Sequence, residues 1–141
     1  PIDLMGGGMT SSDIKNGNFD CKKAALIFAR GTGEPGNMGY VVGPGLGSSL
    51  KKAMNGDVLL QGADYSNIWM FANADFNLAN FSGGGAKEMV TVVQTVMKKC
   101  PDTKIVLGGY SQGAMQVHQA LASLGPDAAK IAAAVTFGDP Y

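Results

Sequence analysis

Residues 104–124 have the sequence KIVLGGYSQGAMQVHQALASL, an apolar run that passes through a glycine-rich turn into a helical pattern. Lys104–Leu107 predicts a buried strand, and Gln112–Leu124 predicts a helix. Between them, Gly109–Gly113 (GYSQG) fits the pattern G-x-S-x-G, which also arises by chance in a glycine-rich chain. A strand that turns sharply into a helix is the context in which this pattern exposes a serine hydroxyl. We therefore predict that Ser111 is the nucleophile of a serine esterase.

Strands and helices alternate along the rest of the chain. Short apolar runs predict three further strands, at Ala24–Ala29, Asp57–Leu60 and Ile131–Phe137. Apolar residues at helical spacing predict two further helices, at Gly43–Met54 and Gly84–Lys99. The aromatic-rich stretch Asp64–Phe81 has no such period, and we predict that it is irregular. Strands that alternate with helices of this length indicate an α/β fold, with three layers (α/β/α) and a mostly parallel central sheet.

Composition indicates one globular domain, since 45% of the 141 residues are hydrophobic and only 16% are charged. Glycines and short polar residues over Pro1–Asn18 predict a loosely ordered arm, so we divide the chain into an arm (1–20) and a domain (21–141). The formal net charge is zero, which gives no electrostatic footprint for nucleic acid or anionic lipid. No apolar run approaches the length of a membrane span, and we expect that any export signal has already been removed.

The two cysteines, Cys21 and Cys100, are 79 positions apart, which fits neither a metal knuckle nor a redox C-x-x-C motif. One long-range disulfide and two buried thiols both remain open on spacing alone. A disulfide closing so long a loop would stabilise the fold by up to about 4 kcal/mol on the chain-entropy model. Asn80 begins the only N-x-[ST] sequon, which makes it a candidate glycosylation site and gives weak support for export.

Acyl transfer needs hydrogen-bond donors aimed at the oxyanion that forms during the reaction. The residue after the nucleophile supplies one backbone N–H, and Gln112 holds that position at a helix N-terminus, where orphan donors favour negative charge. A second donor comes from the loop after an earlier strand. Arg30–Gly36 (RGTGEPG) is such a loop, and Thr32 offers both a backbone N–H and a hydroxyl.

Five motifs together resemble the cutinase family, and they follow its order: Ala29–Gly36 (ARGTGEPG), Gly43-Pro44, Cys100-Pro101, Gly108–Ala114 (GGYSQGA) and Phe137–Pro140 (FGDP). The resemblance runs from about Cys21 to the end of the chain. Cutinases are secreted, lidless α/β-hydrolases that cleave ester bonds in plant cutin and in short-chain lipid-like esters. The resemblance implies that Ser111 is the nucleophile and that Thr32 and the Gln112 amide form the oxyanion hole. It also implies that Cys21 and Cys100 are bridged.

The chain departs from the family at the triad, whose Asp and His would follow tens of residues after the last predicted strand, so we expect neither within this chain. Its one histidine, His118, lies on the same helix as the elbow, about 10 Å along the axis from Ser111. A general base must come within about 3 Å of the hydroxyl, so we predict a helix-surface or partly buried histidine. Asp127 and Asp139 are poor replacements for the triad acid, and we expect Asp139 to organise the turn after its strand.

Three explanations for a nucleophile without its base are open. The chain is one piece of a nicked or incomplete enzyme, a deliberately shortened chain, or a natural short relative that binds without hydrolysing. We favour the first, because a chain that ended after the strand at Val135–Phe137 would lack elements that a parallel sheet needs to cover its faces.

The irregular stretch supplies candidates for a hydrophobic groove that suits an acyl chain: Met70, Phe71, Phe76, Leu78 and Phe81. Met38 and Tyr40 are further candidates for its rim. The sequence therefore predicts a secreted, extracellular carboxylic ester hydrolase acting on cutin-like polyester or short-chain lipid esters. An acetyl esterase on plant polysaccharide and a non-catalytic lipid- or cuticle-binding relative are the alternatives. We expect an ester substrate, no nucleic-acid partner, no metal or cofactor, and a monomer, or else association with the missing C-terminal portion of the same protein.

Overall fold

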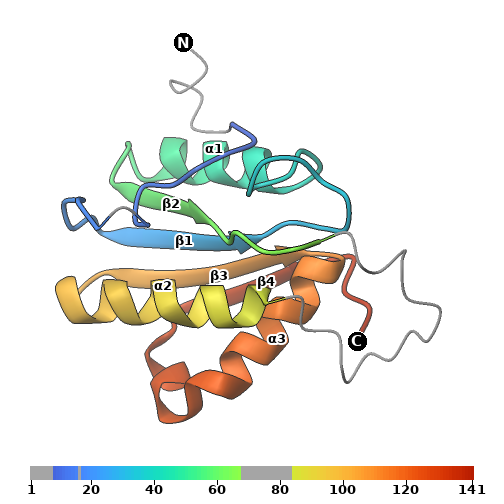
Figure 1. Cartoon of the computed structure of the whole chain (residues 1–141). Helices are drawn as coiled ribbons and strands as arrows, with labels where there is room; N and C mark the ends of the chain where they lie inside the picture. The colour runs from blue at the N-terminus through green and yellow to red at the C-terminus, as the bar shows by residue number, and fades with distance from the viewer. Residues whose placement is uncertain (1–7, 16, 68–83) are drawn as a thin grey trace.

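The computed structural model describes residues 8–15, 17–67 and 84–141, and their centre is a four-stranded sheet (Figure 1). The strand order is β2-β1-β3-β4, and every neighbouring pair is parallel. The strands are β1 (Ala24–Ala29), β2 (Val58–Gly62), β3 (Lys104–Tyr110) and β4 (Ala133–Phe137). In a parallel sheet the carboxyl ends of the strands meet at one edge, so the loops after β1 and β3 lie close together there.

Helices cover both faces of this sheet, as Figure 1 shows. Helix α1 (Gly43–Ala53) lies on one face, while α2 (Gly85–Lys99) and α3 (Gln112–Leu124) lie on the other. A short 3-10 helix, η4 (Gly125–Lys130), connects α3 to β4. The predicted three-layer α/β/α architecture with a parallel sheet is therefore confirmed.

All six residues of β1 are buried, so helices must cover both faces of the sheet at this strand. Its alternate side chains enter two different cores. Ala25 and Ile27 pack with the apolar stripe of α2, whereas Leu26 and Phe28 pack on the α1 side. A six-residue apolar run is thus the signature of a strand that is buried on both faces.

The N-terminal segment differs from its prediction. Residues 8–15 pair with the edge of β2: the Asp13 N–H donates to the Leu60 carbonyl at 3.1 Å, and the Leu60 N–H donates to the Asp13 carboxylate at 2.9 Å. The Gln61 amide oxygen accepts from the N–H groups of Ile14 and Lys15, and Ile14 is only 1% exposed. The prediction of a loosely ordered arm is therefore wrong for its described part, because a buried isoleucine and the free edge of β2 fix it in place.

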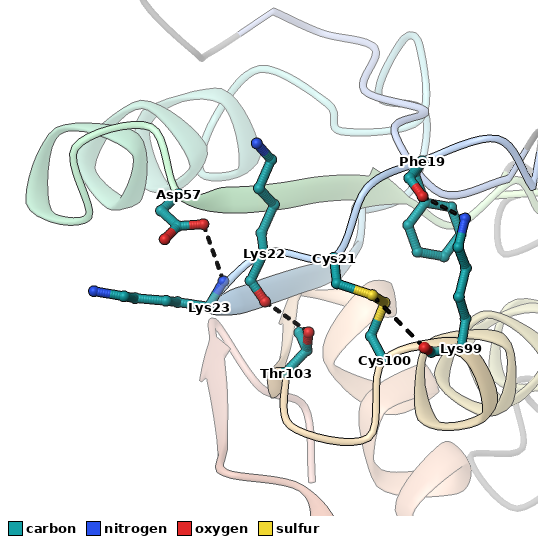
Figure 2. Close-up of a disulfide and its surroundings, with 8 residues drawn as sticks. All are labelled: Phe19, Cys21, Lys22, Lys23, Asp57, Lys99, Cys100 and Thr103. Carbon is teal, nitrogen blue, oxygen red and sulfur yellow. Dashed lines mark hydrogen bonds between the residues drawn. A yellow bond between two sulfur atoms is a disulfide. The ribbon is translucent and has the colours of Figure 1, made fainter.

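A disulfide joins Cys21, just before β1, to Cys100, which follows α2 (Figure 2). Hydrogen bonds of the two residues after Cys21 hold the start of β1 to its neighbours. The Thr103 hydroxyl donates to the Lys22 carbonyl at 2.6 Å, and the Lys23 N–H donates to the Asp57 carboxylate at 3.1 Å. The pairing that the family resemblance implies is present in the structure.

None of the helices in the described ranges is long and apolar enough to cross a membrane. Strand β3 extends three residues beyond its predicted end, to Tyr110, and β4 begins two residues later than predicted. Within the described sheet β4 pairs only with β3, and Ala133 and Ala134 on it are exposed.

Candidate active site

Ser111 lies between the end of β3 and the first residue of α3, with backbone angles of φ 55° and ψ −114°. A positive φ is costly for a residue with a Cβ: such a conformation costs about 1–3 kcal/mol and persists only where its surroundings impose it. Here the Ser111 N–H donates to the Phe137 carbonyl at the end of β4, at 2.9 Å, and its own carbonyl accepts from the Ala114 N–H at 3.0 Å. The sheet and the helix therefore hold the serine in a strained elbow.

Close backbone contacts explain why both outer positions of the G-x-S-x-G pattern are glycine. A Cβ on Gly113 would lie 1.9 Å from the Ala29 carbonyl oxygen on β1, and one on Gly109 would lie 2.4 Å from the Gly113 carbonyl oxygen. Real Cβ atoms do not approach other atoms so closely. The first turn of α3 can cross the sheet at this distance only if both residues lack a side chain.

The oxyanion candidates meet at this elbow. Gln112 is the first residue of α3, so its backbone N–H belongs to the unsatisfied donors of a helix N-terminus. The Thr32 hydroxyl, in the loop after β1, donates to the Gln112 side-chain oxygen Oε1 at 2.8 Å. The Gln112 side chain is fully buried, and its Nε2 has no hydrogen-bond partner within the described part of the chain. The structure thus brings Thr32 and Gln112 into direct contact.

Sequence reasoning missed two residues that hold the Thr32 loop, Glu34 and Asn67. The Glu34 carboxylate accepts from the N–H groups of Gly31, Tyr40 and Val41 at 2.8, 2.9 and 2.9 Å. The Asn67 side-chain Nδ2 donates to the carbonyls of Gly31 and Glu34 at 2.8 and 3.1 Å. Glu34 lies inside the quoted RGTGEPG motif, and an acidic residue there was a usable signal; Asn67 lies 33 positions away and gave none.

His118 is paired elsewhere. Its Nε2 lies 2.6 Å from the Asp139 carboxylate, and the edge of its ring meets the Tyr141 ring with centroids 4.9 Å apart. Asp139 also accepts from the Tyr141 N–H at 3.0 Å, so it organises the end of the described chain. Burial opposes ionisation of Asp139, but hydrogen bonds from His118, Tyr141 and Thr136 outweigh it and lower the pKa of the carboxyl. No hydrogen bond in the described ranges joins His118 to Ser111.

The predicted groove residues Met70, Phe71, Phe76, Leu78 and Phe81, and the sequon residue Asn80, lie outside the described residues. Two residues were predicted at the rim of this groove. The prediction is wrong for Met38, because this residue is fully buried in the core on the α1 side, in the same cluster as Phe28. Tyr40 is 67% exposed. In the parts of the chain that the structure describes, no three His, Cys, Asp or Glu side chains gather in a way that would hold a metal ion.

A strained serine between a parallel strand and a helix, in a sheet covered on both faces, defines the α/β-hydrolase class of fold. The family model for cutinase matches residues 20–141, and the chain belongs to the cutinase family.

Known relatives agree with this assignment. The chain is 48% identical to Cutinase 4 of Emericella nidulans, over 100% of this chain and 59% of the relative. It is 40% identical to Cutinase CUT1 of Coprinopsis cinerea, over 92% of this chain and 63% of the relative. Among solved structures, Trichoderma reesei cutinase in complex with a phosphonate inhibitor superposes with a TM-score of 0.77 at 37% identity, over 99% of this chain and 59% of that one. The chain therefore spans about three-fifths of the length of these relatives.

Proposed function

We propose that this chain carries the nucleophile and the oxyanion hole of a secreted carboxylic ester hydrolase. Its substrates are cutin-like polyester or short-chain lipid esters, the substrate class implied by the family. The observation that carries the proposal is the strained backbone of Ser111, because a φ of 55° at a non-glycine residue persists only where the surrounding structure imposes it. The long-range disulfide is consistent with an oxidising, extracellular location.

In the proposed reaction the Ser111 hydroxyl attacks the ester carbonyl carbon and passes its proton to a general base. The C–O bond to the alcohol breaks as the tetrahedral intermediate collapses, and water then releases the acid from the acyl-enzyme. The backbone N–H of Gln112 and the Thr32 group donate to the developing oxyanion. His118 is the one histidine of this sequence and is paired with Asp139, so the proposal assigns the base to chain outside these 141 residues.

The test uses the longest natural chain that contains this sequence, assayed on p-nitrophenyl butyrate. We expect Ser111→Ala to lower kcat by at least about 10³-fold, because the remaining donors alone support only residual catalysis. Ser123→Ala is the matched control, since this serine lies exposed near the end of the same helix, and it should leave kcat unchanged.

Two outcomes would count against the proposal: a natural chain without esterase activity, or a Ser111→Ala variant that keeps it. Release of acetate from acetylated xylan at a kcat/KM above that for the butyrate ester would instead favour a polysaccharide acetyl esterase.

A further inference from the structure

We propose that Glu34 and Asn67 are positioning residues for the reaction at Ser111, because Glu34 fixes the N–H of Gly31 and Asn67 fixes the two peptide groups that flank Thr32. This inference rests on the proposed function and adds a role for two residues that do not touch the nucleophile. It is carried by a buried polar network around the loop after β1, between Arg30 and Glu34.

Glu34 fixes the N-terminal side of Thr32. Its Oε1 accepts from the Gly31 N–H, while Oε2 accepts from the N–H groups of Tyr40 and Val41. The residue is only 8% exposed, so both ends of its carboxyl group are committed to backbone donors. A carboxylate is acceptor-only, whereas a glutamine would turn its NH₂ group toward one of these N–H donors. The site therefore calls for glutamate and excludes its nearest isostere.

A close approach shows that the chain is shaped around this carboxylate. Gly39 has φ 72°, and a Cβ placed on it would lie 2.3 Å from Glu34 Oε1. Any side chain at position 39 would push the carboxylate away from the Gly31 N–H. Glycine at this position is therefore needed both for the turn and for the contact.

Asn67 fixes the other peptide groups of the loop. Its Nδ2 donates to the Gly31 and Glu34 carbonyls, and its backbone carbonyl accepts from the Gly33 N–H at 3.0 Å. Its Oδ1 accepts from Arg30 Nη2 at 3.0 Å, and the residue is 5% exposed. An aspartate would place a negative oxygen against two carbonyl oxygens. Thus Gly31 is held at both its N–H and its C=O, and Gly33 at its N–H.

Arg30 and Tyr65 anchor this clamp to the segment after β2. The Arg30 guanidinium donates to the carbonyls of Ala63 and Tyr65 at 3.1 and 2.8 Å, and its Nε donates to the Glu34 carbonyl at 3.0 Å. The Tyr65 hydroxyl donates to the Arg30 carbonyl in return. Burial raises the pKa of Tyr65, so the phenol keeps the proton that it donates.

The clamped loop is in contact with the elbow at two points. A Cβ on Gly31 would lie 2.8 Å from the Tyr110 ring, one residue before the nucleophile, and the Thr32 hydroxyl binds Gln112, one residue after it. A shift of Gly31 therefore moves Thr32 relative to the Gln112 N–H. Oxyanion donors act only when they are preorganised, and displacements of about 1 Å can cost 10²-fold in rate.

The test compares two isosteric variants, Glu34→Gln and Asn67→Asp, in the longest natural chain that contains this sequence. Gln61→Glu is the matched control for Asn67→Asp, since it is the same amide-to-carboxylate change at a fully buried side chain that binds Ile14 and Lys15 instead of the Thr32 loop. Four quantities are measured with p-nitrophenyl butyrate as the substrate: the fraction of active sites by burst titration, kcat per active site, KM, and the Ki of butylboronic acid, whose tetrahedral adduct places an oxygen in the oxyanion hole.

We expect kcat per active site to fall about 10- to 100-fold in both variants, with KM changed less than threefold and the boronate Ki raised by a factor similar to the loss of kcat. Gln61→Glu should lower only the fraction of active sites and leave kcat per active site, KM and the boronate Ki unchanged. Should either isosteric variant fail to fold, Glu34→Asp keeps two acceptor oxygens on a side chain one methylene shorter, and the same loss on a smaller scale is expected.

The inference is overturned if kcat per active site and the boronate Ki stay within twofold of the parent in the folded variants. It is equally overturned if Gln61→Glu changes both quantities as much as they do. Ser111→Ala separates this failure from that of the proposed function. An inactive Ser111→Ala beside unaffected Glu34 and Asn67 variants leaves the esterase intact and removes only the positioning role.

Discussion

The Thr32 hydroxyl joins the loop after β1 to the start of α3 through its hydrogen bond to Gln112 Oε1, and the direction of that bond matters. The hydroxyl proton points to Gln112 Oε1, while the buried Gln112 Nε2 has no partner among the described residues. A half-turn of the amide would make Nε2 the donor and the Thr32 oxygen the acceptor. The Thr32 hydroxyl proton would then be free to donate to an oxyanion. The buried group left without a partner would be a lone pair of Gln112 Oε1 instead of the N–H of Nε2.

Substitution at Thr32 tests whether the hydroxyl or only the backbone N–H serves the oxyanion. We expect Thr32→Val, which keeps the shape and removes the hydroxyl, to lower kcat about 10²-fold on p-nitrophenyl butyrate, the usual cost of one lost oxyanion donor. Thr32→Ser restores the hydroxyl and should recover most of the rate. Equal rates for the valine and serine variants would assign the role to the backbone N–H alone.

The N-terminal segment shows how an element gains order from its neighbours. Ser12 bridges to Gln61 in an antiparallel sense, so the segment covers the outer edge of β2, and Ile14 enters the core on the α2 side. An exposed strand edge invites pairing with other chains, and covering it removes that hazard.

Removing the buried side chain at position 14 should therefore release the whole segment. We expect Ile14→Ala to lower the free energy of unfolding by about 2–5 kcal/mol, the cost of a large-to-small change in a core. Chemical denaturation measures this loss. Met9→Ala is the control on the same segment, because Met9 is half exposed, and its effect should stay below about 0.5 kcal/mol. Equal effects from the two variants would show that residue 14 does not anchor the segment.

The elements that sequence alone predicted well are those whose pattern is local. The apolar run of Ala24–Ala29 and the stripe of α2 each carry their own period, and the glycines around Ser111 mark the elbow. The prediction of a loosely ordered N-terminal segment was wrong because the segment is held in place by Gln61, nearly fifty residues away. Asn67 was missed for the same reason: its proposed role depends on loop contacts that no spacing along the chain reveals.

At the scale of the whole molecule, the disulfide lies at the opposite edge of the sheet from the elbow. Cys21 precedes β1 and Cys100 precedes β3, so the bridge lies at the amino ends of the strands, whereas Ser111 lies at a carboxyl end. The loop that it closes contains β1, α1, β2 and α2, which are most of both cores. The disulfide and the proposed nucleophile are therefore separated in space.

Because of this separation, we expect the disulfide to affect the free energy of unfolding and not kcat. Replacing Cys21 by serine and Cys100 by alanine should lower the free energy of unfolding by about 4 kcal/mol, because the unfolded chain regains the freedom of a loop of about 80 residues. The kcat per folded molecule on p-nitrophenyl butyrate should stay within twofold. Urea denaturation of the parent protein with and without dithiothreitol is the control, and the reduced parent should unfold at the midpoint of the double variant. If reduction left that midpoint unchanged, or if the double variant lost kcat in its folded fraction, the bridge would not have the purely stabilising role that its distance from Ser111 implies.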